Sequence, residues 1–237
     1  MIYNNFDSRL LRRSAVLLIL GEIIFLIAGY FHPSREPANN HMAVFAEYAN
    51  SANWTAIHLG QFAGMLAITA GLLILFFALN VHSGTPGLVA RGAAISAVVA
   101  LALYAVLQAV DGVALKQAVD AWATAPDADK AARFATAEAI RWLEWGVRSY
   151  QDFMLGISFI LFAVVIVWTA RIPRPIGYLM GLSGLAYIVQ GLVTGFEGFS
   201  PNNSVPTLIA YILWLAWSIW LLIFAWRTKA PLDNLQL

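Results

Sequence analysis

The chain has 237 residues, of which 60% are hydrophobic and 11% are charged, and its mean hydropathy is +0.71. Soluble domains carry about 25% charged residues, so these values exclude an ordinary soluble domain. The formal net charge of +1, without a basic patch interleaved with aromatic residues, argues against nucleic-acid binding. The absence of cysteine excludes disulfides, thiolate metal sites and cysteine nucleophiles.

Long apolar blocks predict an all-α integral membrane protein that forms a single polytopic domain over residues 1–237. A spanning helix needs about 20 apolar residues at a rise of about 1.5 Å per residue. Six segments meet this requirement: Arg13–Phe31, Trp54–Asn80, Val89–Leu115, Ser149–Ala170, Ile176–Gly195 and Thr207–Trp226. The first segment has a basic flank, as a signal peptide does, but it is too long and contains Glu22. We therefore expect an uncleaved first span.

Lysine and arginine are divided unequally between the two ends of the predicted spans. One end carries Arg9, Arg12, Arg13, Arg91, Arg171, Arg174, Arg227 and Lys229, whereas the other carries Arg35, Lys116, Lys130 and Arg133, with Arg141 near it. The positive-inside rule then places both termini in the cytoplasm and the three longer loops outside a plasma membrane. We expect the loops to be partly helical and to cap the bundle, with a short amphipathic helix over Ala43–Ala49. Another helix is expected to begin near Ala128 and to run into the fourth span, as one long helix or as a pair kinked at Gly146.

The fourth span opens with an unusual ladder of charged residues. At helical spacing, Arg141, Glu144, Arg148 and Asp152 share one face. A charge at the centre of a membrane helix costs about 2.5–3.5 kcal/mol, so these groups are expected either at the interface or paired inside the bundle. Asp111 in the third span also needs a partner, and Arg148 is the predicted one. Asp111, Arg148, Asp152 and Glu144 are therefore candidate catalytic residues, with structural ion pairs as the alternative.

Other polar residues of the spans concentrate in the predicted outer half of the membrane. Their convergence is typical of a pocket open to the outside, and the candidate ligand-binding residues are His58, Gln61, Tyr104, Gln108, Tyr187, Gln190, Glu197 and Trp214. The sequence contains no HExxH, HxxxH or Glu-x-x-His pair, so no metal site is predicted, and the cofactor, if any, is left open. The residues that could still supply metal ligands are His32, His58 and Asp111, and the two histidines could also be axial haem ligands.

Three functions remain open from the sequence. The first is a pocket that binds a small or lipid-like ligand, with acid–base catalysis on a membrane-accessible apolar substrate as its enzymatic form. The second is a non-catalytic accessory or assembly subunit of a membrane complex, and the third is a small-solute or ion-coupled transporter. A transporter would need polar residues near mid-membrane, where only Glu22 is expected. Whether the protein is an enzyme is left open.

The fifth span carries a stripe of glycines, Gly177, Gly181, Gly184, Gly191, Gly195 and Gly198. Small residues at this spacing allow close approach of a neighbouring helix, from the same chain or from a second subunit. An inverted repeat of three spans and three spans is compatible with the predicted topology. No sequence similarity between the two halves supports it.

Overall fold

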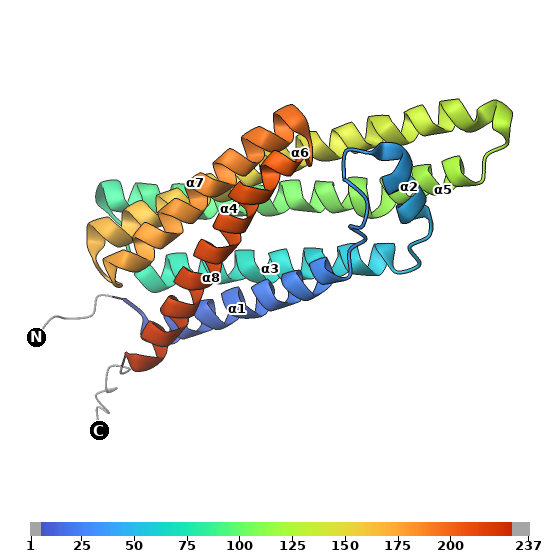
Figure 1. The fold of residues 1–237 in the computed structure, drawn as a ribbon. Helices are drawn as coiled ribbons and strands as arrows, with labels where there is room; N and C mark the ends of the chain where they lie inside the picture. The colour runs from blue at the N-terminus through green and yellow to red at the C-terminus, as the bar shows by residue number, and fades with distance from the viewer. Residues whose placement is uncertain (1–5, 229–237) are drawn as a thin grey trace, which may run out of the picture.

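The structure is a computed structural model, and it describes residues 6–228. The described residues form helices and no strands (Figure 1). In chain order the elements are α1 (Ser8–Tyr30), α2 (His41–Ala49), α3 (Trp54–Leu79), α4 (Gly84–Ala109), the π-helix η1 (Val110–Leu115), α5 (Lys116–Ala123), α6 (Asp127–Thr169), α7 (Arg174–Glu197), the 3₁₀-helix η2 (Pro201–Asn203) and α8 (Ser204–Arg227). The predicted all-α class is confirmed.

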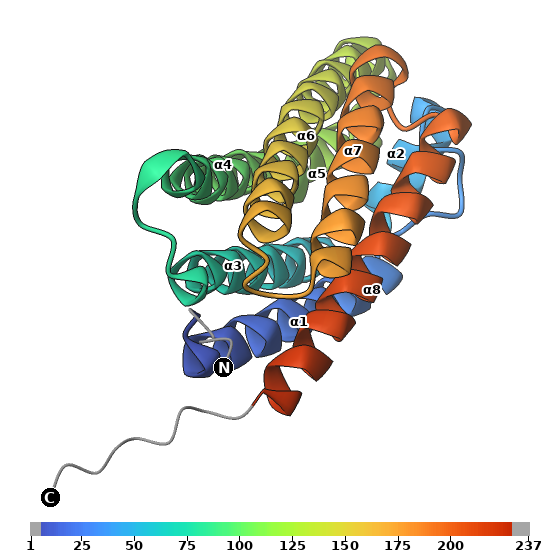
Figure 2. The ribbon, with the colours of Figure 1, turned by 90° about the vertical axis from the view of Figure 1, so that its left-hand side faces the viewer.

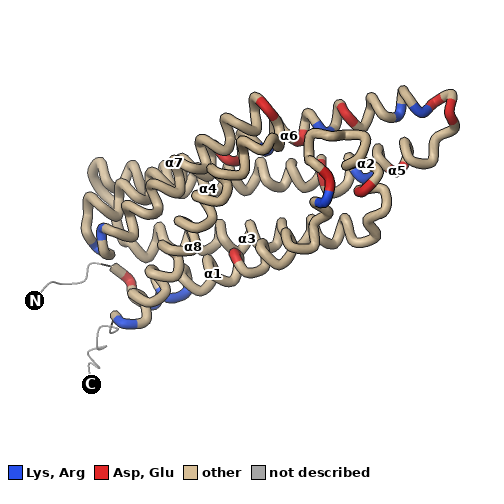
Figure 3. Tube along the Cα trace, in the orientation of Figure 1, with Lys and Arg blue, Asp and Glu red and all other residues tan. Residues whose placement is uncertain are grey.

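Five helical stretches of the described chain are long and apolar enough to cross a membrane: Trp54–Leu79, Gly84–Ala123, Asp127–Thr169, Arg174–Glu197 and Pro201–Arg227. They contain five of the six predicted spans. The remaining segment lies in α1, which is not among the five, so a count of six spans is not confirmed. Charged residues gather near the two ends of the bundle, and its middle is nearly free of them (Figure 3). This distribution is the one expected of helices surrounded by lipid.

The long helices form a ring in chain order. Each long helix contacts the next one along the chain, in the order α1, α3, α4, α6, α7 and α8, and α8 also contacts α1 (Figure 2). The interior is filled by large apolar side chains, among them Ile68, Leu72, Phe159 and Trp217, all fully buried. Because lipid tails are as apolar as these side chains, the stability of such a core comes from close packing more than from exclusion of water.

A close glycine contact joins α1 and α3. A Cβ atom added to Gly21 would lie 2.7 Å from the carbonyl oxygen of Gly64, and one added to Gly64 would lie 2.9 Å from that of Gly21. Farther along the same pair of helices, Ser14 donates a hydrogen bond of 2.8 Å to the carbonyl of Gly71. The two backbones therefore touch, which only the absence of side chains at these positions allows.

The same contact joins α6 and α7. A Cβ atom on Gly156 would lie 2.6 Å from the carbonyl oxygen of Gly184, and the reverse distance is also 2.6 Å. Ser149 donates a hydrogen bond of 2.7 Å to the carbonyl of Gly191. The glycine stripe therefore does admit a neighbouring helix, but that neighbour is α6 of the same chain. At Gly184 and Gly191 the close contact is thus made within the chain, which is one of the two alternatives that the sequence left open.

These two contacts are equivalent position by position. The serine and glycine of the first helix have the same spacing in both pairs (Ser14 and Gly21 in α1, Ser149 and Gly156 in α6), and so do the two glycines of the second helix (Gly64 and Gly71 in α3, Gly184 and Gly191 in α7). In each pair the serine bonds the second of these glycines. Helix packing therefore repeats although the sequences of the two halves are dissimilar.

The two repeats run in opposite directions. The backbone N–H of Asp7, which precedes α1, donates to Ala78 near the end of α3, and Arg171, which follows α6, donates to Leu79. The start of α1 and the end of α6 thus lie at the same end of the bundle. Each pair is followed by a third long helix, α4 or α8, which packs on it. The packing is that of an inverted repeat of three helices and three helices.

The connections at the other end of the bundle are partly helical and form a cap. The amphipathic helix expected at Ala43–Ala49 is α2, and α6 starts at Asp127 and continues unbroken past Gly146. The helices α2 and α5, together with the ends of α3 and α6, enclose a second apolar cluster of Val44, Phe45, Tyr48, Trp54, Leu115, Val119, Trp122 and Ala137. This cluster fixes the cap over the end of the ring.

Candidate functional site

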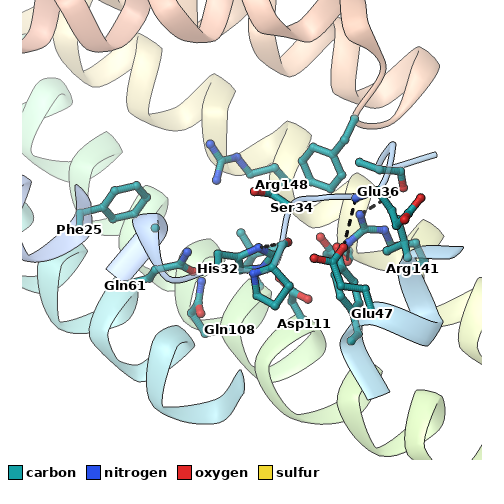
Figure 4. A pocket seen from close by; sticks show the side chains of 18 of the residues that line it. Phe25, His32, Ser34, Glu36, Glu47, Gln61, Gln108, Asp111, Arg141 and Arg148 are labelled. Atoms are coloured by element: carbon teal, nitrogen blue, oxygen red, sulfur yellow. Dashed lines mark hydrogen bonds and ion pairs between the residues drawn. The ribbon is translucent and has the colours of Figure 1, made fainter. Parts of the chain in front are cut away.

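A cavity of about 500 Å³ lies inside the ring beneath the cap. It is bounded by α1, α3, α4, α6 and α8, by α2 of the cap, and by the connection that contains His32, Ser34 and Glu36 (Figure 4). Its wall includes both charged groups and aromatic rings, and Asp111, Arg148 and Phe25 are examples. A cavity of this size and mixed lining is typical of a small-molecule site.

The π-helix η1 positions Asp111 on the cavity wall. A π-turn contains an extra residue, so it shifts the register of the helix and leaves backbone groups to other partners. Here Trp54 Nε1 donates a hydrogen bond of 2.9 Å to the carbonyl of Asp111. A Cβ atom on Gly112 would lie 2.7 Å from Cβ of His58, so α3 approaches closely at this glycine. The turn and the glycine together place Asp111 against His58.

Asp111 is bonded to His58 and not to Arg148. His58 Nε2 and Asp111 Oδ2 are 2.9 Å apart, and His58 Nδ1 lies 2.8 Å from the carbonyl oxygen of Trp54. Since carbonyl and carboxylate oxygens only accept, both ring nitrogens of His58 donate, Nδ1 to Trp54 and Nε2 to Asp111. The predicted Asp111–Arg148 pair is wrong, because η1 turns the carboxylate towards α3. The second carboxylate oxygen, Oδ1, is buried without a hydrogen-bond partner.

His32 approaches the same carboxylate from the connection after α1. His32 Nδ1 lies 2.8 Å from the carbonyl oxygen of Pro33, so this ring also carries its proton on Nδ1. One potential ligand atom from each of His32, His58 and Asp111 lies within 4.8 Å of the other two. Burial lowers the pKa of His32 below its usual value, an effect larger than the opposing influence of Asp111. The ring of His32 is therefore neutral near pH 7.

A haem bound between the two histidines does not fit this geometry. The ring centroids of His32 and His58 are 5.3 Å apart, and the rings meet edge to face. Axial ligands point at each other across the porphyrin, whereas Nε2 of His58 points at the carboxylate of Asp111.

Two ion pairs along α6 complete the charged wall. Arg141 Nη1 and Glu144 Oε2 are 2.6 Å apart, and both side chains are 3% exposed. Arg148 Nε donates to Asp152 Oδ2 over 3.1 Å, and Asp152 is fully buried. The ladder seen in the sequence therefore lies inside the bundle. Such buried pairs are strongly coupled because their surroundings screen charge poorly.

Arg141 is also held by aromatic rings of the cap. Its guanidinium lies 4.9 Å from the ring centroid of Phe199 and 5.6 Å from that of Tyr48. Cations are attracted to the faces of aromatic rings at these distances. Burial raises the pKa of Tyr48 well above its usual value, so this phenol remains neutral.

The structure brings together some of the predicted residues and separates others. Those that line the cavity are Asp111, Glu144, Arg148, Gln61, Tyr104 and Gln108. Asp152 lies behind Arg148, and His58 lies behind Asp111. Four other predicted residues do not line the cavity. Tyr187 and Trp214 pack on Phe159 in the core, and Gln190 is buried with its Oε1 unpaired. Glu197 accepts hydrogen bonds from Ser200 and Asn202.

Sequence reasoning missed the cavity residues that come from the cap. Glu36, Glu47, Tyr48 and Phe199 lie in or beside loops, and no helical periodicity connects them to the spans. Arg141 also lines the cavity, and its place in the charged ladder of α6 could have identified it as a site residue. The cap residues had no comparable signal, because only the tertiary fold brings the connections after α1 and α7 and the helix α2 over the ring.

An apolar groove adjoins the cavity between α3 and α4. It has a volume of about 240 Å³ and includes Leu59, Phe62 and Ala105 in its lining. Leu59 is 66% exposed, so the groove opens on the outer surface of the bundle. Gln108 lines both the groove and the cavity, and its Oε1 is buried without a partner. A polar chamber and an apolar groove thus share a wall.

Comparison with protein-family models identifies this chain as a member of a family. Residues 13–225 match the family described as "Domain of unknown function (DUF4386)", and the chain belongs to it. No curated protein and no solved structure matches the chain. The chain is thus a multi-pass, membrane-type helical protein of this family.

Proposed function

We propose that this protein binds an amphiphilic, lipid-like molecule, with the polar end in the cavity and the apolar chain in the groove between α3 and α4. The observation that carries the proposal is the wall shared through Gln108. A molecule with one polar and one apolar end is the ligand that matches both compartments. The unpaired Oε1 of Gln108 is an acceptor for a donor group on such a ligand.

The charged wall supports a role in acid–base chemistry on the bound molecule. Asp111 and Glu144 are carboxyl groups that line the cavity, and Arg148 lines it beside Tyr104 and Tyr211. A positioned carboxyl group can donate or accept a proton in a transition state. Arg148 is then a fixed positive charge that stabilises negative charge as it develops. In this proposal Asp152 positions Arg148 and His58 positions Asp111.

We propose further that the molecule has six spans, with α1 as the first, both termini in the cytoplasm and the cavity at the outer face of the plasma membrane. The inverted repeat supports this topology, because α1 occupies the place in its repeat that the spanning helix α6 has in the other. Beyond Arg13, α1 contains one charged residue, Glu22, which accepts a hydrogen bond of 3.0 Å from Ser218. The end of the bundle that holds Arg171 and Arg227 is then cytoplasmic.

Filling the cavity tests ligand binding. Gly29 lines the cavity, and a Cβ atom there meets nothing within 4 Å. Gly146 has the same open surroundings but does not line the cavity, so Gly146→Leu is a matched control. We expect wild type and Gly146→Leu to retain a lipid-like species through gentle detergent purification, measured by native mass spectrometry, and Gly29→Leu to lose it. Equal retention by both variants, or no retained species in wild type, would contradict the proposal.

A transporter is the second candidate, because many secondary transporters are built from inverted repeats with a site between them. Wild-type protein reconstituted in vesicles distinguishes the two functions. Transfer of the retained species across the bilayer would identify a carrier. Retention without transfer would leave the binding or catalytic function.

A further inference from the structure

We infer that His32, His58 and Asp111 form a binding site for one divalent transition-metal ion of the zinc class, in the wall of the cavity. Their potential ligand atoms lie within 4.8 Å of one another. Ligands at about 2.0–2.1 Å from a tetrahedral ion are separated by roughly 3.3 Å, so the set is close to a metal geometry. His32 lies in the connection that follows α1 and can close the remaining distance without moving a helix.

Both imidazoles are already oriented as metal ligands are. Nδ1 of each ring donates to a carbonyl oxygen, that of Pro33 or Trp54, at 2.8 Å, which leaves Nε2 as the coordinating atom on both rings. At His58 the metal ion replaces the Nε2 proton, which is released to solvent. Metal-bound histidines in general donate the other ring N–H to a carbonyl or a carboxylate. Trp54 contacts both ligands, because its carbonyl accepts from His58 and its indole N–H donates to the backbone carbonyl of Asp111.

The carboxylate of Asp111 lacks the partners that its burial requires. Its Oδ1 atom has no hydrogen bond, and Oδ2 is bonded only to His58. The wall of the cavity includes three further carboxylates, Glu36, Glu47 and Glu144, but only two guanidinium groups, those of Arg141 and Arg148. This excess of carboxylates favours a bound cation. Burying a carboxylate oxygen without a partner costs free energy, and a bound metal ion would remove that cost at Asp111.

The type of site follows from the donors. Two imidazoles and a carboxylate suit zinc or ferrous iron, and catalytic zinc sites have three protein ligands and an open position. Since Asp111 and His32 line the cavity, the open position faces it, where water or a polar group of a ligand can bind. The inference shares a cavity with the proposed function but does not depend on it, because metal binding is measured without any organic ligand. With the metal ion bound, Glu144 rather than Asp111 is the carboxyl group of this wall that is left for acid–base chemistry.

A second histidine–carboxylate pair is the matched control. His41 Nδ1 and Glu138 Oε1 are 3.0 Å apart, almost the same separation as in the His58–Asp111 pair. Among the described residues, no third ligand joins His41 and Glu138 in a cluster. His41→Ala therefore removes a comparable pair without touching the inferred site.

The experiment uses the full-length protein in detergent, stripped with a chelator and titrated with zinc chloride alone. Bound metal is counted by mass spectrometry, and cobalt substitution adds a visible spectrum that reports the coordination number. We expect one zinc per chain for wild type and for His41→Ala. We expect at least about a hundredfold weaker binding for His32→Ala, His58→Ala and Asp111→Asn, since even the loss of an outer partner weakens a site about 10–100-fold.

His32→Ala carries the test if the buried variants fail to fold, because His32 lies outside the helices. Size-exclusion profiles and circular dichroism identify variants that remain folded. Wild type that takes up neither zinc nor cobalt overturns the inference, and so does wild-type affinity in His32→Ala. Metal binding with no retained organic species would disprove the proposed lipid-like ligand alone. Retention of that species without metal binding would disprove the metal site alone.

Discussion

Replacing Gly184 by alanine tests the contact between α6 and α7. The new Cβ atom would lie 2.6 Å from the carbonyl oxygen of Gly156 and 3.1 Å from the backbone nitrogen of Ile160. A carbon and a carbonyl oxygen normally stay about 3.3–3.6 Å apart, so the overlap is about 0.7 Å. Both clashing atoms belong to the backbone and cannot rotate away. The two helices must therefore separate.

The magnitude follows from two opposing effects. Overpacking costs about 1–3 kcal/mol, and a contact with backbone atoms belongs near the upper end of that range. Replacing glycine by alanine inside a helix contributes about 0.8–1.0 kcal/mol in the opposite direction. We expect a net loss of about 1–2 kcal/mol in the free energy of unfolding. Gly146→Ala, whose Cβ meets nothing within 4 Å, should gain up to about 1 kcal/mol.

Reversible unfolding in mixed detergent micelles measures the two variants side by side. Gly184→Ala as stable as Gly146→Ala would refute the reasoning. The inverted repeat extends the test to Gly64, whose Cβ would lie 2.9 Å from the carbonyl oxygen of Gly21. Gly64→Ala should lose a similar free energy, and a neutral effect there would refute the equivalence of the two contacts.

Two further predictions concern topology and the charged wall. Since the chain contains no cysteine, single cysteines can be placed at Arg13, in the first turns of α1, and at Ala52, in the connection between α2 and α3. With an impermeant maleimide on intact cells we expect labelling at position 52 alone, and labelling at both positions would show that α1 does not cross. Glu144→Gln removes the charge that pairs with buried Arg141, and we expect a loss of about 3 kcal/mol in the free energy of unfolding. The exposed-pair control Asp120→Asn should lose less than about 1 kcal/mol, and equal losses would show that burial of the Glu144 pair contributes nothing.

The sequence alone determined the class of the molecule. Hydropathy is a property of consecutive residues, so the apolar segments that became α3, α4, α6, α7 and α8 were visible without coordinates. The charged ladder of α6 was also local, because helical spacing places Arg148 and Asp152 together wherever the helix lies. The glycines of α7 indicated a close neighbour for the same reason, although not which helix it would be.

The tertiary structure decided which distant groups meet. Asp111 turns to His58 because a π-turn alters the register of its helix, and no periodicity in the sequence reports such a turn. His32 and Tyr48 reach the cavity only because an apolar cluster under the cap folds their connection over the ring. The repeat of the Gly21 and Gly156 contacts was hidden because packing constrains a few small residues and leaves the lipid-facing ones to vary. Local patterns fix the helices, whereas partners far apart in the chain are chosen by packing, which depends on the whole fold.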